Sequence, residues 1–92
     1  MTREINRMAV VGAGIMGTGI AQIAAQAGIQ VLLFDNREGA AQAARDNLEQ
    51  TLDKLASKGK ILGADAQATL DRLQVATALT ELKEVELVVE AI

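Results

Sequence analysis

The sequence of 92 residues contains no cysteine, histidine, proline, tryptophan or tyrosine, and Phe34 is its single aromatic residue. Without cysteine the chain can form neither a disulfide nor a thiolate metal site. Without histidine it lacks the commonest metal ligand and the commonest general base. A metal site would then need converging carboxylates, and nothing in the sequence requires one. We therefore predict no metal.

The chain also has little excess of charge of either sign. Lys and Arg number 9 against 12 Asp and Glu, a net charge of −3, which argues against binding to nucleic acid or to an anionic membrane surface. The polar start MTREINR is neither a signal peptide nor a typical transit peptide, and no apolar run is long enough to span a bilayer. The sequence thus predicts a soluble, cytoplasmic chain with no membrane partner.

Half of the residues are hydrophobic, so the core must consist of Ala, Val, Ile and Leu, as in buried parallel strands. A predicted strand over 5–11 runs into three glycines spaced G-x-G-x-x-G, Gly12, Gly14 and Gly17, and a helical pattern over 14–27 follows. Gly12 permits a tight turn, Gly14 lets a pyrophosphate approach the backbone, and Gly17 lets the helix lie close to its strand. This context favours a dinucleotide fingerprint over a glycine turn without a ligand.

The start of this helix offers unpaired N–H groups and the positive end of the helix dipole to a phosphate. We expect the backbone N–H groups of Ile15 and Met16 to be the donors, whereas the Met16 side chain is expected to pack on the core with Ile20, Ile23, Ala24 and Ala27. The predicted cofactor-binding residues of the turn are Gly12, Ala13, Gly14, Ile15, Met16 and Gly17.

An acid, Asp35, follows the next predicted strand, 30–34, at about the 20-residue spacing that the fingerprint requires. At this position a carboxylate accepts both hydroxyls of an adenosine ribose and repels a 2′-phosphate, which predicts NAD rather than NADP. Arg37 complicates this prediction, because an arginine there can pair with a 2′-phosphate. The alternative is that Asp35 is a solvated residue after the strand and binds no ribose. Glu90, at the end of the last predicted strand, is a weaker candidate for a nucleotide contact.

Strands and helices alternate along the remainder of the chain, which predicts right-handed crossovers and a parallel sheet. We expect an α/β fold, a partial Rossmann-type doubly wound sheet of strand order 3-2-1-4. The helices over 38–57 and 65–73 form an antiparallel pair that a plain crossover does not need, so this pair is an insertion. The remaining predicted elements are a strand over 74–77, a helical turn over 79–85 and a strand over 86–92.

A doubly wound sheet has further strands beyond the fourth. Residues 1–92 are therefore expected to form a truncated NAD-binding Rossmann domain, with a C-terminal substrate and dimerisation domain absent. The uncovered edge of the fourth strand predicts self-association into a homo-oligomer.

Four stretches together closely resemble the 3-hydroxyacyl-CoA dehydrogenase family over the whole chain: VVGAGIMGTGIAQ at 10–22, LFD at 33–35, SKGK at 57–60 and LVVEAI at 87–92. The resemblance implies an NAD-dependent enzyme that oxidises (S)-3-hydroxyacyl-CoA to 3-oxoacyl-CoA in fatty-acid metabolism such as β-oxidation. It further implies that the helical pair helps to hold the CoA part of the substrate. The positions that match the family's CoA contacts are Thr51 and Lys58.

The family's catalytic residues match positions beyond Ile92, so the resemblance implies that this chain carries none and is inactive alone. Two alternatives stay open. One is the cofactor domain of a 3-hydroxyisobutyrate or 6-phosphogluconate type dehydrogenase, which shares the G-x-M-G turn but lacks the inserted helical pair, so that residues 60–73 discriminate against it. The other is a stand-alone nucleotide-binding regulatory module.

Overall fold

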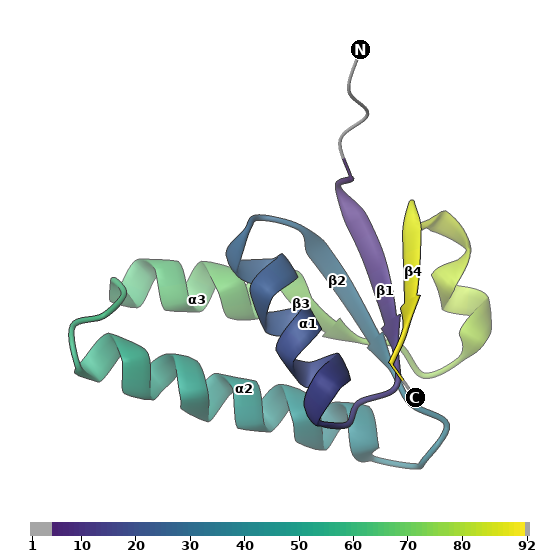
Figure 1. The fold of residues 1–92 in the computed structure, drawn as a ribbon, viewed down its shortest axis with the longest axis horizontal. Coiled ribbons are helices and arrows are strands. Elements are labelled where there is room, and N and C mark those ends of the chain that lie inside the picture. The colour runs from purple at the N-terminus through teal and green to yellow at the C-terminus, as the bar shows by residue number, and fades with distance from the viewer. Residues whose placement is uncertain (1–4, 92) are drawn as a thin grey trace.

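Four parallel strands in the order β3-β2-β1-β4 form the sheet of the computed structural model, which describes residues 5–91 (Figure 1). The predicted α/β fold and strand order are confirmed. The elements are β1 (Arg7–Val11), α1 (Ile15–Gln26), β2 (Gln30–Phe34), α2 (Ala40–Ser57), α3 (Gly63–Arg72), β3 (Leu73–Val75), the 3₁₀ helix η1 (Leu79–Glu84) and β4 (Leu87–Glu90).

Parallel pairing brings the carboxyl ends of three strands together at one edge of the sheet. Val11 of β1 lies opposite both Phe34 of β2 and Glu90 of β4. The glycine turn leaves the sheet at this edge, as does the loop that carries Asp35 (Figure 1). In open α/β sheets, ligands bind outside this edge where the strand order reverses, here between β1 and β4.

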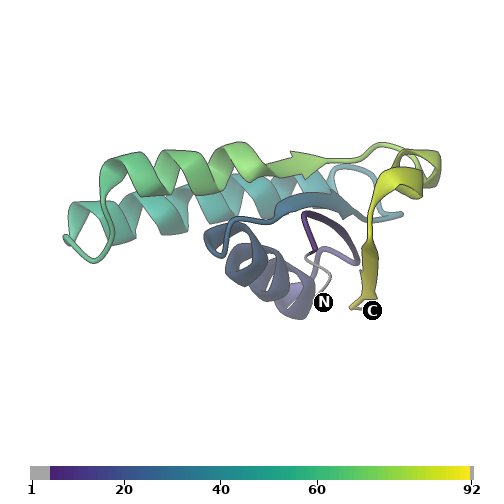
Figure 2. The same cartoon turned by 90° about the horizontal axis from the view of Figure 1, so that it is seen from above.

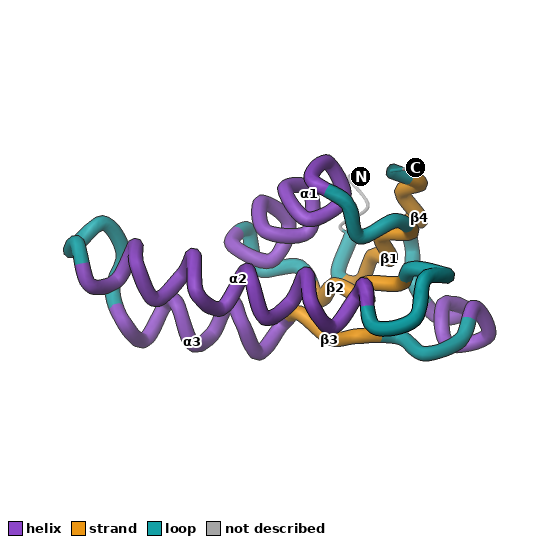
Figure 3. The backbone as a smooth tube through the Cα atoms, turned by 90° about the horizontal axis from the view of Figure 1, so that it is seen from below, coloured by secondary structure: helices purple, strands orange, loops and turns teal. Residues whose placement is uncertain are grey.

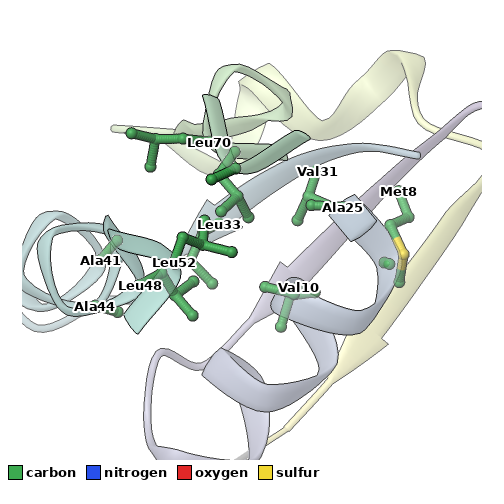
Figure 4. Close-up of a cluster of buried hydrophobic side chains, with 14 residues drawn as sticks. Met8, Val10, Ala25, Val31, Leu33, Ala41, Ala44, Leu48, Leu52 and Leu70 are labelled. Carbon is green, nitrogen blue, oxygen red and sulfur yellow. The ribbon is translucent and has the colours of Figure 1, made fainter. Parts of the chain in front are cut away.

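The inserted helical pair is also confirmed. Helices α2 and α3 lie side by side, run in opposite directions and extend away from the sheet beyond β3 (Figures 1 and 3). One stripe of α2 faces the core at helical spacing and is buried, with Ala41, Ala44, Leu48 and Leu52 (Figure 4). Leu55, predicted in the same stripe, is only partly buried.

Two arginines fix the helices to one another. The Arg45 guanidinium of α2 donates to the carbonyl oxygens of Leu73 and Leu70 at 2.7 and 3.2 Å. Arg72 of α3 donates to the carbonyl oxygen of Ala25, in the last turn of α1, at 2.9 Å. These contacts join α3 to α1 and join α2 to the end of α3 and the start of β3.

Helix α1 packs only partly as predicted. Its buried residues are the small ones, Gly17, Ala21, Ala24 and Ala25, and α1 packs against β1 and β2 on one side of the sheet, the lower side in Figure 2. Met16 and Ile23, expected in the core, are 69 % and 71 % exposed. The prediction was right for Ala24, which is buried, and wrong for Met16 and Ile23, because close packing of a helix on a sheet favours the face with the smallest side chains.

Element bounds differ from the predicted ones by a few residues. Helix α2 begins at Ala40 because Gly39 has a positive φ of 77°. The last predicted strand reaches Ile92, which lies outside the described residues, as do the first four residues of the polar start. Within residues 5–91, no helix combines the length and the apolar character that a membrane crossing needs.

Candidate nucleotide-binding site

The glycine turn is held in a conformation that its glycines make possible. Gly12 has a φ of 109°, in the region that favours glycine, and its N–H donates to the Phe34 carbonyl oxygen at 2.8 Å. A Cβ on Gly17 would overlap the Gly12 carbonyl oxygen and lie 2.9 Å from its carbon. A Cβ on Gly14 would meet no atom within 4 Å among residues 5–91, its chain neighbours aside. The turn is therefore closed on its helix side and open at Gly14.

The start of α1 carries no compensating group. Gly14 is the N-cap, no side chain among residues 5–91 caps the helix, and the first turn contains no acid. The side chains of Ile15 and Met16 are both exposed. The positive end of the helix dipole and the N–H groups of the first turn thus remain available to an anion.

Asp35 joins the end of β2 to this turn. Its Oδ2 accepts the Ala13 N–H at 2.8 Å, and its Oδ1 accepts the Arg37 N–H at 2.8 Å. The side chain of Asp35 is only 5 % exposed. Hydrogen bonds from the Arg37 side chain, then from the Ala13 and Arg37 backbones, hold the pKa of Asp35 well below its ordinary value of 3.8. Asp35 is consequently a carboxylate at neutral pH, placed beside the turn.

The guanidinium of Arg37 covers this carboxylate. Its Nε donates to Oδ1 at 3.0 Å and its Nη2 to Oδ2 at 2.8 Å, a two-point ion pair. Arg37 itself is 67 % exposed at its side chain. Sequence reasoning placed Arg37 near the ribose position but could not show that it pairs with Asp35.

A cavity of about 490 Å³ lies against the turn and Asp35. It opens where the carboxyl ends of β1, β2 and β4 meet the start of η1. Its lining residues are Val11, Gly12, Gly14, Phe34, Asp35, Asn36, Arg37, Leu79 and Ala91. This combination of apolar walls with one carboxylate suits an adenosine, whose base is apolar on its faces and whose ribose offers two hydroxyls.

Leu79 is a wall of this cavity that sequence reasoning missed. The connection that carries it is fixed by Glu81, whose Oε2 accepts the N–H of Ala78 at 2.7 Å, and the N–H and Oγ1 of Thr77 at 2.6 and 2.9 Å. These bonds lower the pKa of Glu81. The signal that could have indicated this was an acid, Glu81, two residues after Leu79 at the start of the predicted helical turn.

A second cavity, of about 560 Å³, lies between α1 and α2. It begins at Ala13 and Gly14 of the turn, and Thr51 lines it further along α2. The Thr51 hydroxyl donates to the Asn47 carbonyl oxygen at 3.0 Å. The structure thus brings Thr51, but not Lys58, to a groove beside the turn. Lys58 is exposed at the C-cap of α2, about 10 Å from Thr51 along the helix axis.

Glu90 is exposed at the end of β4 and does not line the cavity beside Asp35, whereas its neighbour Ala91 does. No group of three or more carboxylates that could hold a metal occurs among residues 5–91.

Comparison with known proteins places this geometry in a family. The chain is 37 % identical to 3-hydroxybutyryl-CoA dehydrogenase of Mycobacterium tuberculosis over 92 residues, all of this chain and 32 % of that protein. It is also 37 % identical over 91 residues to 3-hydroxyadipyl-CoA dehydrogenase of Escherichia coli, 99 % of this chain and 19 % of that protein. The chain therefore spans a third or less of the length of these relatives.

Solved structures of dehydrogenases of the same kind also match this chain. The crystal structure of 3-hydroxybutyryl-CoA dehydrogenase from E. coli matches with a TM-score of 0.92 and 36 % identity, over 96 % of this chain and 19 % of that one. That of (S)-3-hydroxybutyryl-CoA dehydrogenase from Ralstonia eutropha matches with a TM-score of 0.89 and 36 % identity, over 96 % of this chain and 31 % of that one. The family profile described as "3-hydroxyacyl-CoA dehydrogenase, NAD binding domain" covers residues 7–92. The chain belongs to this family of NAD-binding domains.

Proposed function

We propose that this chain holds the NAD of an enzyme that oxidises (S)-3-hydroxyacyl-CoA to 3-oxoacyl-CoA. The observation that carries the proposal is the ionised, nearly buried Asp35, which bonds to the backbone of the glycine turn beside a cavity of about 490 Å³. Membership of the family and the names of the relatives support the reaction and the substrate class.

The residues present fit NAD. The open space at Gly14 and the uncapped start of α1 suit a pyrophosphate, held by the backbone of Gly12, Ala13, Gly14, Ile15, Met16 and Gly17. Because the Ala13 N–H already donates to Asp35, the N–H groups of Ile15 and Met16 are the better phosphate donors. Asp35 accepts the hydroxyls of the adenosine ribose. When bound, NAD supplies the acceptor for the hydride, and this chain binds and orients it.

The test is calorimetric titration of the full translation product containing these residues with NAD and with NADP. We expect NAD to bind at least about tenfold more tightly, since a carboxylate at the ribose repels a 2′-phosphate. Nicotinamide mononucleotide, which lacks adenosine, serves as the control ligand and should bind much more weakly than NAD. Tighter binding of NADP than of NAD would contradict the assignment of Asp35.

We further propose that α2 contributes to CoA binding through Thr51 and Lys58. Thr51 lines the groove that begins at the turn, and Lys58 is an exposed cation that suits an anionic ligand. Replacing Lys58 by methionine should raise the KM for acyl-CoA about fivefold, with little change in NAD affinity. The matched control is Lys54→Met, one turn earlier and also exposed. Equal effects of the two substitutions on the KM would argue against a specific contact at Lys58.

The wider setting is also a proposal. We propose a cytoplasmic location, a role in fatty-acid metabolism such as β-oxidation, and a homo-oligomer. The metabolic role is supported by a relative named as the alpha subunit of a fatty acid oxidation complex. The inserted helices α2 and α3 favour a 3-hydroxyacyl-CoA dehydrogenase over a dehydrogenase of the 3-hydroxyisobutyrate or 6-phosphogluconate type.

A further inference from the structure

We infer that the Arg37 side chain occupies, in the nucleotide-free chain, the positions on Asp35 that the adenosine ribose requires, and that it must move aside before NAD binds. Arg37 would thereby weaken NAD binding and reduce the ratio of the affinity for NAD to the affinity for NADP. The inference rests on the proposed function, in which Asp35 binds the ribose.

The acceptor positions of Asp35 are fully used. A carboxylate offers about four lone-pair positions. Two accept the backbone N–H groups of Ala13 and Arg37, and the other two accept Nε and Nη2 of the Arg37 side chain. A ribose diol needs two acceptor positions. The backbone donors belong to the two loops that build the site, so the guanidinium is the group that a ribose displaces.

Arg37 also has room to move. Its side chain is largely exposed, and both of its hydrogen bonds among the described residues go to Asp35. The residue lines the cavity beside Asp35, the groove between α1 and α2, and a third cavity of about 540 Å³ at the loop between β2 and α2. Because Arg37 stands where these three spaces meet, its side chain can leave the carboxylate without displacing another element.

The displaced guanidinium stays close to the ribose 2′ position, because Arg37 is only two residues from Asp35 and its backbone remains bonded to Oδ1. An ordinary ribose gains nothing specific from it. A 2′-phosphate would form a charge-assisted pair with it, which offsets part of the repulsion from Asp35. Arg37 thus lowers the affinity for NAD and raises the affinity for NADP.

The test compares wild-type protein with Arg37→Gln in the full translation product, by calorimetry with ADP-ribose and with 2′-phospho-ADP-ribose. These ligands report on the adenosine half of the site, without a contribution from nicotinamide. We expect Arg37→Gln to bind ADP-ribose about fivefold more tightly, the scale of an exposed ion pair, and to bind 2′-phospho-ADP-ribose about tenfold more weakly. The Arg37 Nε–H resonance of wild-type protein should also shift on addition of ADP-ribose.

The matched control is Arg7→Gln. Arg7 forms an exposed ion pair with Glu84 at 3.4 Å, and it starts β1 at the opposite edge of the sheet. This substitution changes the charge equally and should leave both affinities within about twofold. If wild-type protein binds ADP-ribose and Arg37→Gln binds it no more tightly, or the Nε–H resonance does not move, the inference on Arg37 is overturned alone. If neither protein binds ADP-ribose, the proposed NAD site falls, and the inference falls with it.

Discussion

Replacing Gly17 by alanine is expected to lower the free energy of unfolding by about 3 kcal/mol and to abolish NAD binding. The added methyl group would overlap the Gly12 carbonyl oxygen, lie 2.9 Å from the Gly12 carbon and lie 3.4 Å from Cγ1 of Val10. Backbone cannot yield as a flexible side chain does, so either the turn moves away from α1 or the helix moves away from β1. Both movements displace the N–H groups that are proposed to hold the pyrophosphate. Urea unfolding and NAD titration measure the two effects.

Gly19→Ala is the matched control in the same helix. A Cβ at Gly19 meets no atom within 4 Å, and alanine in a helix interior is more favourable than glycine by about 0.5 to 1 kcal/mol. We therefore expect Gly19→Ala to stabilise the chain slightly and to keep NAD binding. Equal free energies of unfolding for Gly17→Ala and Gly19→Ala would show that the close contact between α1 and the turn does not require glycine at position 17.

The sequence predicted those features that depend on backbone chemistry. A glycine with positive φ at Gly12 and a close approach at Gly17 each exclude other residue types, so the pattern of residue types alone reveals them. The strand order followed because parallel strands joined by right-handed crossovers leave few topologies. Asp35 was predicted from its place directly after β2, because the end of a strand determines where the next side chain lies.

Features that depend on a choice between side chains were not predictable. In α1 both faces carry apolar residues, and only the distance between helix and sheet decides that Ala21 and Ala25 are buried rather than Met16 and Ile23. The pairing of Arg37 with Asp35 depends on one side-chain conformation among many. Leu79 reaches the cavity through a loop whose path is set by the hydrogen bonds of Glu81, which leave a weak trace in the sequence.

Replacing Asp35 by asparagine should weaken NAD binding about 100-fold, because hydrogen bonds to a charged acceptor contribute about 1.5 to 3 kcal/mol each and the ribose makes two of them. Asparagine keeps the size of the side chain but loses the charge and replaces one acceptor oxygen by a donor. The preference for NAD over NADP should fall or reverse, since the group that repels a 2′-phosphate is gone while Arg37 remains. Calorimetry with both dinucleotides measures the change.

The stability of this variant separates the two roles of Asp35. In wild-type protein the folded pKa lies below the ordinary value of 3.8, so the contribution of Asp35 to stability is complete above about pH 4 and is lost as the pH falls below that value. The Asp35→Asn variant should therefore be less stable at pH 7, while its unfolding free energy should fall less between pH 5 and pH 2. Asp53→Asn, on the exposed face of α2, is the matched control for the loss of one carboxylate. If Asp53→Asn weakened NAD binding as much as Asp35→Asn, net charge rather than a ribose contact would explain the loss.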